Sequence, residues 1–411
     1  MRDVDLYQQI LGLASPWSVA RVELDTQAQR VEVWVEHPPD LRWPCPTCAR
    51  ELGGYDHAPR RTWRHLDTCQ FQTHLHGRIP RVNCPEHGVA QVEVPWAGKH
   101  SRFTLLMERM VIDTLQACQS VSRTCKLTGV SWDQAWAIME RAVARGQQRK
   151  REQPDAGPTR LGIDEKAFRK GHSYMTIVCD IDRSTVEYVA DGRKTSSLEG
   201  YYESRTPEQL SQVESVSMDM WPAYIKATLD HLPGAEEKIV FDRFHVMKLA
   251  SDAVDKVRRA EHKTLCAAGD DTLTRTKYLW LYNEENIPAK HRDRFDAVKD
   301  QQLRTSRAWA IKETLRDLWE YASPGWARRF FARWFSWARR SQLEPIKRLA
   351  LTLKSHLDNI VTYCKHAITN GVAEGLNSKI MTIKRLAGGF RNPENFKTAI
   401  YFHCGGLDLH P

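Results

Sequence analysis

Three acidic residues stand where the sequence predicts two strand ends and one helix. Asp164 follows the apolar run of LGIDEKAF, Asp219 ends VSMD, and Glu374 lies in the helical stretch TNGVAEGLNSKI. Carboxylates at adjoining strand ends face one edge of a sheet, and a helix packed there adds a third. Three hard oxygen donors suit Mg²⁺ or Mn²⁺, and two such ions promote in-line displacement at phosphorus. We therefore predict a metal-dependent phosphoryl-transfer site at these residues.

Other acids compete for this role. Asp242 with His245, in FDRFHVMK, is the strongest rival, and whether either contributes is left open by the sequence. The remaining competitors are Glu165, Asp180 and Asp182. On the helix of Glu374, spacing places several polar or long side chains near one face, where they could help to hold a metal and flanking phosphates. They are Asn377, Ser378, Met381 and Arg385, with Lys384 beside them.

Two short motifs, CPTC and CPEH, carry paired metal ligands. Cys45 and Cys48 form one knuckle, and Cys84 and His87 form the second. Thiolate and imidazole in this spacing predict a tetrahedral Zn²⁺ site, which is structural because four protein ligands leave no open position. The fourth ligand stays open, since three further ligand-type residues lie between the knuckles. These are Cys69, His74 and His76.

A helix-turn-helix is predicted in SVSRTCKLTGVSWDQAWAIMERAV. The first helix covers 122–127, Gly129 lies in the turn, and the second helix covers 132–143. Ser131 is positioned to cap the second helix, with Gln134 at the capping-box position. The predicted core residues are Val121, Ala135, Ile138 and Val143. An ordinary helical hairpin is the alternative.

A basic stretch rich in tryptophan follows later in the chain. Between Pro324 and Arg348 there are seven basic residues and one acid. If the stretch is one helix, the residues Phe330, Trp334 and Ala338 lie on a buried stripe beside a cationic one. We predict that the cationic stripe contacts DNA, with a solvated cationic face as the alternative. The predicted DNA-binding residues here and near the last helix are Arg329, Arg333, Arg340, Lys384, Arg385 and Arg391.

The order of predicted elements indicates a multidomain α/β protein. After an N-terminal helix (6–13) and a hairpin, a ribbon-like region and a helical region lead to strands and helices in the order β-β-β-α-β-α-β-α. That order is typical of an RNase H-like domain, here interrupted by an all-helical insertion. The predicted domains are a zinc-ribbon module (1–98), a helix-turn-helix (99–146), a linker (147–160), a catalytic domain (161–242 and 366–411) and a helical insertion (243–365).

Composition narrows the class of protein. The 411 residues carry a formal charge of +9, which favours a polyanionic partner. We expect no membrane partner, because no apolar run approaches the roughly 20 residues that span a bilayer, and the first residues lack the features of a signal peptide. A cytoplasmic location is expected. Scattered cysteines are interpreted as buried thiols rather than a disulfide framework.

At these motifs the sequence resembles the ISL3 family of bacterial insertion-sequence transposases. The matching segments are CPTC…CPEH, the helix-turn-helix, GIDEKAF, SMDMWPAY, FDRFHVMK and NGVAEGLNSKIMTIKRLAGGFRNPENF. The resemblance implies a DDE transposase whose triad is Asp164, Asp219 and Glu374. It also implies recognition of the terminal inverted repeats of the element and strand transfer into target DNA. A homodimer is expected on functional grounds, because two ends must be joined.

Two other classes remain to be weighed against this interpretation. One is a zinc-dependent DNA-binding regulator with an inactive RNase H-like scaffold, which the presence of all three acids disfavours. The other is a nuclease, such as a resolvase, that cleaves but does not join. A zinc hydrolase is disfavoured because the zinc ligands are complete.

Overall fold

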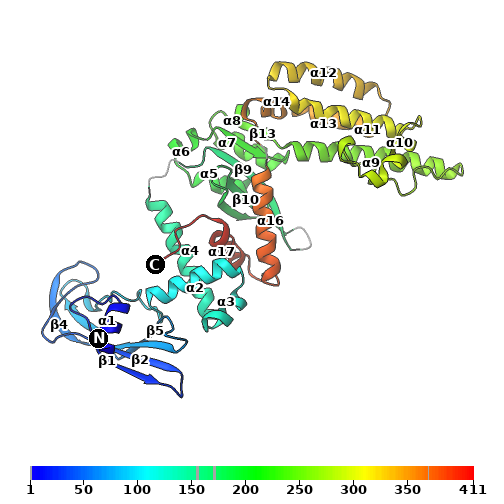
Figure 1. The fold of residues 1–411 in the computed structure, drawn as a ribbon. Coiled ribbons are helices and arrows are strands. Elements are labelled where there is room, and N and C mark those ends of the chain that lie inside the picture. Colours follow the sequence, from blue (N-terminus) through cyan, green and yellow to red (C-terminus); the bar gives the residue numbers. More distant parts are fainter. Residues whose placement is uncertain (1, 154–156, 170–172, 369) are drawn as a thin grey trace. The chain divides into compact units, whose positions relative to one another are not determined.

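The computed structural model describes residues 2–153, 157–169, 173–368 and 370–411 (Figure 1). The chain forms two compact units. The first comprises Met1–Gln153 with Ile383–Pro411, and the second comprises Pro154–Thr382. This division differs from the predicted domains, because the end of the chain packs within the first unit. The described helices include none long and apolar enough to cross a bilayer.

The N-terminal part of the first unit holds two four-stranded sheets. Their orders are β1-β2-β6-β5 and β3-β4-β7-β8. The predicted hairpin is confirmed as β1 and β2, which pair antiparallel, and alternate residues of β2 are buried as a period of two requires. The helix predicted over 6–13 begins earlier and ends at Ile10. The element bounds are α1 Asp3–Ile10, β1 Ser18–Asp25, β2 Arg30–Glu36, β3 Arg42–Pro44, β4 Glu51–His57, β5 Arg61–Arg64, β6 Gln72–Gly77, β7 Pro80–Cys84 and β8 Gly88–Gln91.

Three helices follow, α2 (Leu105–Cys118), α3 (Val121–Thr128) and α4 (Trp132–Glu152). Gly129, at φ 69°, makes the turn between α3 and α4. The predicted capping box is confirmed: Gln134 N–H donates to Ser131 Oγ at 3.2 Å, and Ser131 N–H donates to Gln134 Oε1 at 2.9 Å. The predicted core is confirmed as well, since Ala135, Ile138 and Val143 are buried and Val121 packs against them.

The second helix of this motif is longer than predicted. α4 continues to Glu152, so the first half of the predicted linker 147–160 is helical, and residues 154–156 lie outside the described residues. The C-terminal tail explains the extension. Gly146 has no room for a Cβ, which would lie 2.7 Å from Leu407, and Arg149 pairs with Asp408 at 2.7 Å. Helix α17 (Pro393–Cys404) also packs on α4.

The second unit contains a five-stranded sheet of order β11-β10-β9-β12-β13. β9, β10 and β11 pair antiparallel, whereas β12 pairs parallel with both β9 and β13. The predicted alternation of strands and helices is confirmed. The bounds are β9 Arg160–Arg169, β10 Ser173–Asp180, β11 Thr185–Asp191, α5 Thr195–Glu203, α6 Pro207–Ser211, β12 Ser215–Met218, α7 Pro222–His231, α8 Ala235–Lys238 and β13 Ile239–Phe241.

From Arg243 to His366 the chain is described throughout and forms helices without a strand. α9, α11, α12 and α13 pack successively on one another (Figure 1). The bounds are α9 Arg243–Ala267, η1 Glu284–Asn286, α10 Ala289–Lys299, α11 Arg304–Leu315, η2 Arg316–Glu320, α12 Pro324–Arg340, α13 Glu344–Ser355, α14 Leu357–Val361 and α15 Tyr363–His366. The next helix, α16 (Gly371–Leu386), ends before Gly388 and Gly389, as predicted.

Candidate active site and metal centre

Asp164 and Asp219 lie side by side at the edge of the second-unit sheet. Asp164 is inside β9 rather than at its end, because β9 continues to Arg169 in its pairing with β10. The edge of the sheet near Asp164 is instead formed by the end of the shorter neighbouring strand β12, which stops at Met218. Ser217 of β12 pairs parallel with Gly162 of β9, so two residues beyond this pair the chain reaches Asp219 on one strand and Asp164 on the other. The register therefore brings the two carboxylates together.

The electrostatics of this pair reflect burial and like charge. Burial raises the pKa of Asp164, and the negative charge of Asp219 raises it further, whereas the Glu165 backbone N–H and the nearby His245 lower it. Burial also raises the pKa of Asp219; His245 lowers it, and the negative charge of Glu165 raises it further. Both carboxylates are therefore harder to ionise than an exposed aspartate. A bound cation would stabilise their ionised forms.

Glu374 is not brought into the same cluster. It is exposed on α16, and its helix meets the site through Asn377, whose Nδ2 donates a hydrogen bond to Asp164 Oδ2. Among the described residues, the four Cys and His residues of the N-terminal knuckles form the one group of three or more metal-ligand residues whose ligand atoms all lie within 4.8 Å. Sequence spacing put Asn377 on the Glu374 face, but it did not identify the direct contact with Asp164.

The start of α16 packs closely on β9. A Cβ on Gly162 would lie 2.8 Å from Cys179 Sγ and 3.2 Å from Asn370 Oδ1, so the helix start and the strand can approach only at a glycine. Asn370 is 1% exposed, and both polar atoms of its side chain lack a hydrogen-bond partner among the described residues. The site therefore contains buried polar atoms beside the carboxylates.

The rival acid Asp242 occupies the next strand along the edge. Met218 of β12 pairs with Phe241 of β13, so Asp242 follows at the level of Asp219. Its side chain is buried and accepts a hydrogen bond from the Asn370 backbone N–H at 3.5 Å, at the start of α16. Asp242 thus has a positioning contact, and His245, the third residue of α9, lies near enough to Asp164 and Asp219 to lower the pKa of both.

The other rival acids have partners elsewhere. Asp180 ends β10, where it pairs with Leu161 near the start of β9, and its Oδ1 accepts two backbone N–H groups of the turn that follows. Asp182 pairs with Arg160. Glu165 pairs with Arg193 at 3.1 Å, and both lie near enough to Asp219 to shift its pKa, Glu165 upward and Arg193 downward. Asp180 and Asp182 are thus turn and ion-pair residues, whereas Glu165 forms an ion pair beside the site.

The zinc-ribbon ligands are gathered as the sequence predicts. The knuckle of Cys45 and Cys48 joins β3 to β4, and that of Cys84 and His87 joins β7 to β8. Cys48 Sγ and Cys84 Sγ are 3.8 Å apart, the separation expected of two thiolates on a tetrahedral ion with Zn–S bonds of about 2.3 Å. Hydrogen bonds from the Cys48 and Thr47 backbone N–H groups lower the pKa of Cys45, which favours the thiolate. The arrangement fits a structural Zn²⁺.

The three alternative zinc ligands lie apart from this cluster. His74 and His76 are on β6 in the other sheet, where both face Glu32, at 3.6 Å and 2.6 Å. Cys69 is exposed and stands in a turn with φ 48°. All ten cysteines are free thiols.

The basic stretch forms the helix α12, and its two stripes separate as predicted. Phe330, Trp334 and Ala338 are buried, and Trp334 Nε1 donates to the Ile311 carbonyl at 2.8 Å. Arg329, Arg333 and Arg340 are exposed. Within the part of the chain that the structure describes, neither Arg329 nor Arg333 forms an ion pair, and Arg329 lies 4.8 Å over the ring of Trp326. The outer face of α12 therefore carries cationic groups that are not neutralised by acids.

The cations near the end of α16 lie in the first unit. Arg385 and Arg391 are exposed and Lys384 is half-buried. They flank the turn at Gly388 and Gly389, which have φ values of 67° and 97°. Both glycine N–H groups bond back to the last turn of α16, to the Arg385 and Lys384 carbonyls. This fixes the helix end next to Arg391.

Comparison with known proteins supports the order of these parts. The zinc-finger model of insertion-sequence transposases matches residues 41–87, the helix-turn-helix model of ISL3 transposases matches 92–143, and the ISL3 transposase model matches 161–400. The chain is 28% identical over 422 aligned residues to the transposase of insertion element IS1557 from Mycobacterium tuberculosis, covering 96% of this chain and 94% of the relative. It is 27% identical to the transposase of IS1001 from Bordetella parapertussis, covering 86% of each chain.

The family model for the transposase domain covers more than half of the chain, and the zinc-finger and helix-turn-helix models precede it in the order that the structure shows. The zinc cluster and the helix-turn-helix both lie within their matched segments, as do the paired aspartates. This chain belongs to the ISL3 family of insertion-sequence transposases.

Proposed function

We propose that this transposase binds the terminal inverted repeats of its element and carries out Mg²⁺-dependent cleavage and strand transfer in an RNase H-like catalytic domain. The observation that carries the proposal is the parallel register of β12 and β9, in which Asp219 and Asp164 both lie two residues beyond the pair of Ser217 and Gly162. Three antiparallel strands followed by two parallel ones support the RNase H-like assignment. The helices from Arg243 to His366 are proposed as an insertion into that domain.

The residues at the edge fit a divalent cation. Asp164 and Asp219 are half-buried; partial burial, and to a lesser extent the negative charge of Asp219, raise the pKa of Asp164. Asn377 Oδ1 is buried and has no partner among the described residues. Carboxylate and amide oxygens are ligands that Mg²⁺ accepts. We propose Asp164, Asp219 and Glu374 as the holding residues. When bound, the metal polarises phosphoryl oxygens and lowers the pKa of water.

The proposed chemistry consists of two in-line displacements at phosphorus. In the first, water attacks a phosphodiester at the element end, the P–O3′ bond breaks, and a free 3′-hydroxyl remains. In the second, the oxygen of that hydroxyl attacks a target phosphodiester and forms a new P–O bond that joins element and target, while the target P–O3′ bond breaks and the target 3′-oxygen leaves as a hydroxyl. The residues of the chain orient the reacting groups: Asn377 holds Asp164 in place, and the neighbouring His245 lowers the pKa of both aspartates against the effect of burial.

DNA binding is assigned to three surfaces in this proposal. The zinc ribbon and helix-turn-helix recognise the ends, the exposed arginines of α12 hold backbone phosphates, and Lys384, Arg385 and Arg391 add contacts. Two element ends must be joined in one reaction, so a homodimer on paired ends is proposed.

The test is cleavage and joining of duplexes that carry the element ends, which are read from the DNA flanking the gene. Alanine variants of Asp164, Asp219 and Glu374 are expected to bind the ends and to lose both reactions. Asp242→Ala and His245→Ala decide whether these neighbours are required. Near-normal cleavage by an alanine variant removes that residue from the triad, and cleavage without joining by the wild type identifies a nuclease.

A further inference from the structure

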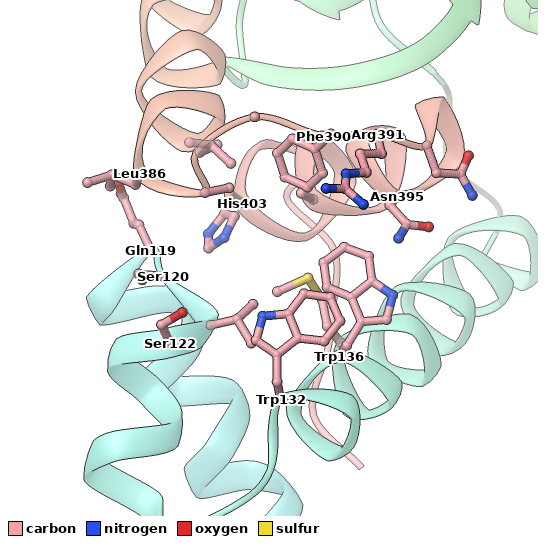
Figure 2. Close-up of a pocket in the computed structure, with 17 residues that line it drawn as sticks. Gln119, Ser120, Ser122, Trp132, Trp136, Leu386, Phe390, Arg391, Asn395 and His403 are labelled. Carbon is pink, nitrogen blue, oxygen red and sulfur yellow. The ribbon is translucent and has the colours of Figure 1, made fainter.

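The first unit contains a pocket that the proposed catalytic chemistry does not use. It has a volume of about 360 Å³ and lies between the helix-turn-helix and the C-terminal segment (Figure 2). One wall comes from α3 and the start of α4, and the other comes from the end of α16, the following turn and α17. Its volume is within the range of about 300–1,000 Å³ in which proteins bind small organic molecules.

Aromatic rings form the floor and the opposite wall. Trp132 and Trp136, one turn apart on α4, stack with ring centroids 5.5 Å apart and planes inclined by 5°. Trp136 is buried, whereas Trp132 is 49% exposed, so the stack ends in an open indole face. Phe390 from the C-terminal segment stands 6.5 Å from Trp136, across the pocket (Figure 2). A planar ring entering here would extend an existing stack.

Polar groups surround these rings. Arg391 and Asn395 extend over the tryptophans from the C-terminal side, and Gln119 and His403 also line the space (Figure 2). Carboxylates are absent from the lining residues that the structure describes, and Arg391 is the permanent cation among them. The set suits an anionic ligand that has a flat ring with hydrogen-bonding edges, which is the chemistry of a nucleotide.

The walls are preorganised rather than loose. The capping box of Ser131 and Gln134 fixes the first turn of α4, on which Trp132 is the first helical residue. Trp136 Nε1 donates to Glu140 at 2.8 Å, which orients the second indole. Opposite, Asn392 caps α17 by accepting the Glu394 N–H at 3.0 Å. Both sides of the pocket are therefore held by contacts that do not depend on a ligand.

We propose that this pocket binds one unstacked nucleobase of the DNA, with the base on the open face of Trp132 and its phosphate near Arg391. The inference rests on the proposed function in that the DNA is the element end or its target. A paired base cannot enter, because both of its faces are covered by its neighbours in the duplex. A base that is unpaired or extruded exposes a face to the indole and an edge to Asn395 and His403.

The test uses the full, zinc-containing chain without added Mg²⁺ and compares two 30-base-pair duplexes that differ by a single unpaired adenine. Fluorescence anisotropy measures affinity, and 2-aminopurine in place of the adenine reports stacking. The wild type is expected to bind the duplex with the unpaired base about tenfold more tightly and to quench 2-aminopurine, since stacking on an aromatic side chain contributes on the order of a tenfold gain.

Two variants at the same position give the decisive comparison. Trp132→Ala is expected to lose the preference and the quenching while still binding the paired duplex, and Trp132→Phe is expected to keep most of both. Tyr278→Ala, which removes an aromatic ring that is 70% exposed in the second unit, is the matched control and should behave as the wild type.

The outcomes separate this inference from the proposed function. Equal binding of both duplexes by the wild type overturns the pocket assignment and leaves DNA binding intact. Failure to bind any duplex overturns both. A third outcome is that the wild type shows no preference for the unpaired base but forms a concentration-dependent dimer that Trp132→Ala abolishes. This outcome assigns the pocket to a second copy of the chain and also overturns the proposal.

Discussion

The Asn377 side chain on α16 donates a hydrogen bond to Asp164 on β9, across 213 positions of sequence. Asn377 is 4% exposed, and its Oδ1 has no partner among the described residues. The contact joins the helix that carries Glu374 to the strand that carries the first aspartate. It gives α16 a fixed position on the site even though Glu374 itself remains exposed.

Replacing this amide by a carboxylate should shift the pH dependence of cleavage. In Asn377→Asp, a negative charge beside Asp164 raises the pKa of Asp164 beyond its already raised value, so the aspartate becomes protonated at higher pH. The acid side of the pH–rate profile is therefore expected to move upward. Asn377→Ala should lower the rate with a smaller shift. Ser378→Ala, on the exposed neighbour, is the control, and an unmoved profile in Asn377→Asp would falsify the contact.

Metal binding should stabilise the chain in a pH-dependent way. The pKa values of Asp164 and Asp219 are raised in the folded state, so the folded chain holds these protons more tightly than the unfolded one, and the pair destabilises the fold as the pH rises through its raised pKa values. The proposed Mg²⁺ would bind the deprotonated pair and offset this loss. Saturation at 100 times Kd should add about 2.7 kcal/mol at neutral pH, and less as the pH falls toward those pKa values.

Thermal unfolding of the double variant Asp164→Asn, Asp219→Asn provides the measurement. Without metal at neutral pH, the variant is expected to unfold at a higher temperature than the wild type, because two half-buried carboxylates with raised pKa values are replaced by neutral amides. It should gain nothing from Mg²⁺. Asp358→Asn, at an exposed acid far along the sequence, serves as the control. A Mg²⁺-dependent gain in the double variant equal to that of the wild type would place the metal elsewhere.

Sequence periodicity predicted the sheet and the helix-turn-helix because both depend on local patterns. Alternation of apolar residues gives β1 and β2, and Ser131 with Gln134 gives the start of α4. The end of α4 could not be predicted, because it depends on Asp408 and Leu407 from the far end of the chain. Hydrophobic pattern alone does not identify such a distant partner.

The residues of the candidate site also fall into two groups: those that a local sequence pattern identifies and those that depend on distant parts of the chain. The knuckle spacing of the zinc ligands is local, so Cys45, Cys48, Cys84 and His87 could be identified from sequence. Asp164 and Asp219 were predicted from strand ends, although the edge is set by the short partner β12 rather than by the end of β9. The contact of Asn377 with Asp164 and the exposure of Glu374 follow from how α16 packs on β9, which sequence spacing does not specify.

A methyl group at Gly162 should separate α16 from β9. The added Cβ of Gly162→Ala would meet Cys179 Sγ at 2.8 Å and Asn370 Oδ1 at 3.2 Å, and overpacking of this kind costs about 1–3 kcal/mol. The variant is expected to unfold at lower denaturant and to cleave more slowly. Gly375→Ala on α16 meets no atom within 4 Å and should be neutral or stabilising by up to about 1 kcal/mol. Equal stability of the two variants would contradict the close packing.

The zinc site should bind one ion per chain and hold the ribbon together. Cys84→Ser and His87→Ala remove ligands from the four-atom cluster, so both are expected to reduce the zinc content and to unfold the N-terminal sheets. His74→Ala removes a histidine that faces Glu32 and should retain the zinc. Metal analysis with circular dichroism checks each variant. Full zinc content in His87→Ala would transfer the fourth position to another residue.

The outer face of α12 should contribute phosphate contacts. Arg329 and Arg333, one turn apart and without ion pairs among the described residues, present two cations over a buried aromatic stripe. Each phosphate contact removed lowers the slope of log K against log salt by close to one unit. The double variant Arg329→Glu, Arg333→Glu is therefore expected to bind end DNA more weakly and with a slope reduced by about two. Arg304→Glu, Arg307→Glu on α11 makes the same change in net charge and is the control. If both double variants weaken binding equally, the effect is due to net charge rather than to α12. If the α12 variant binds DNA as the wild type does, Arg329 and Arg333 do not contact phosphates.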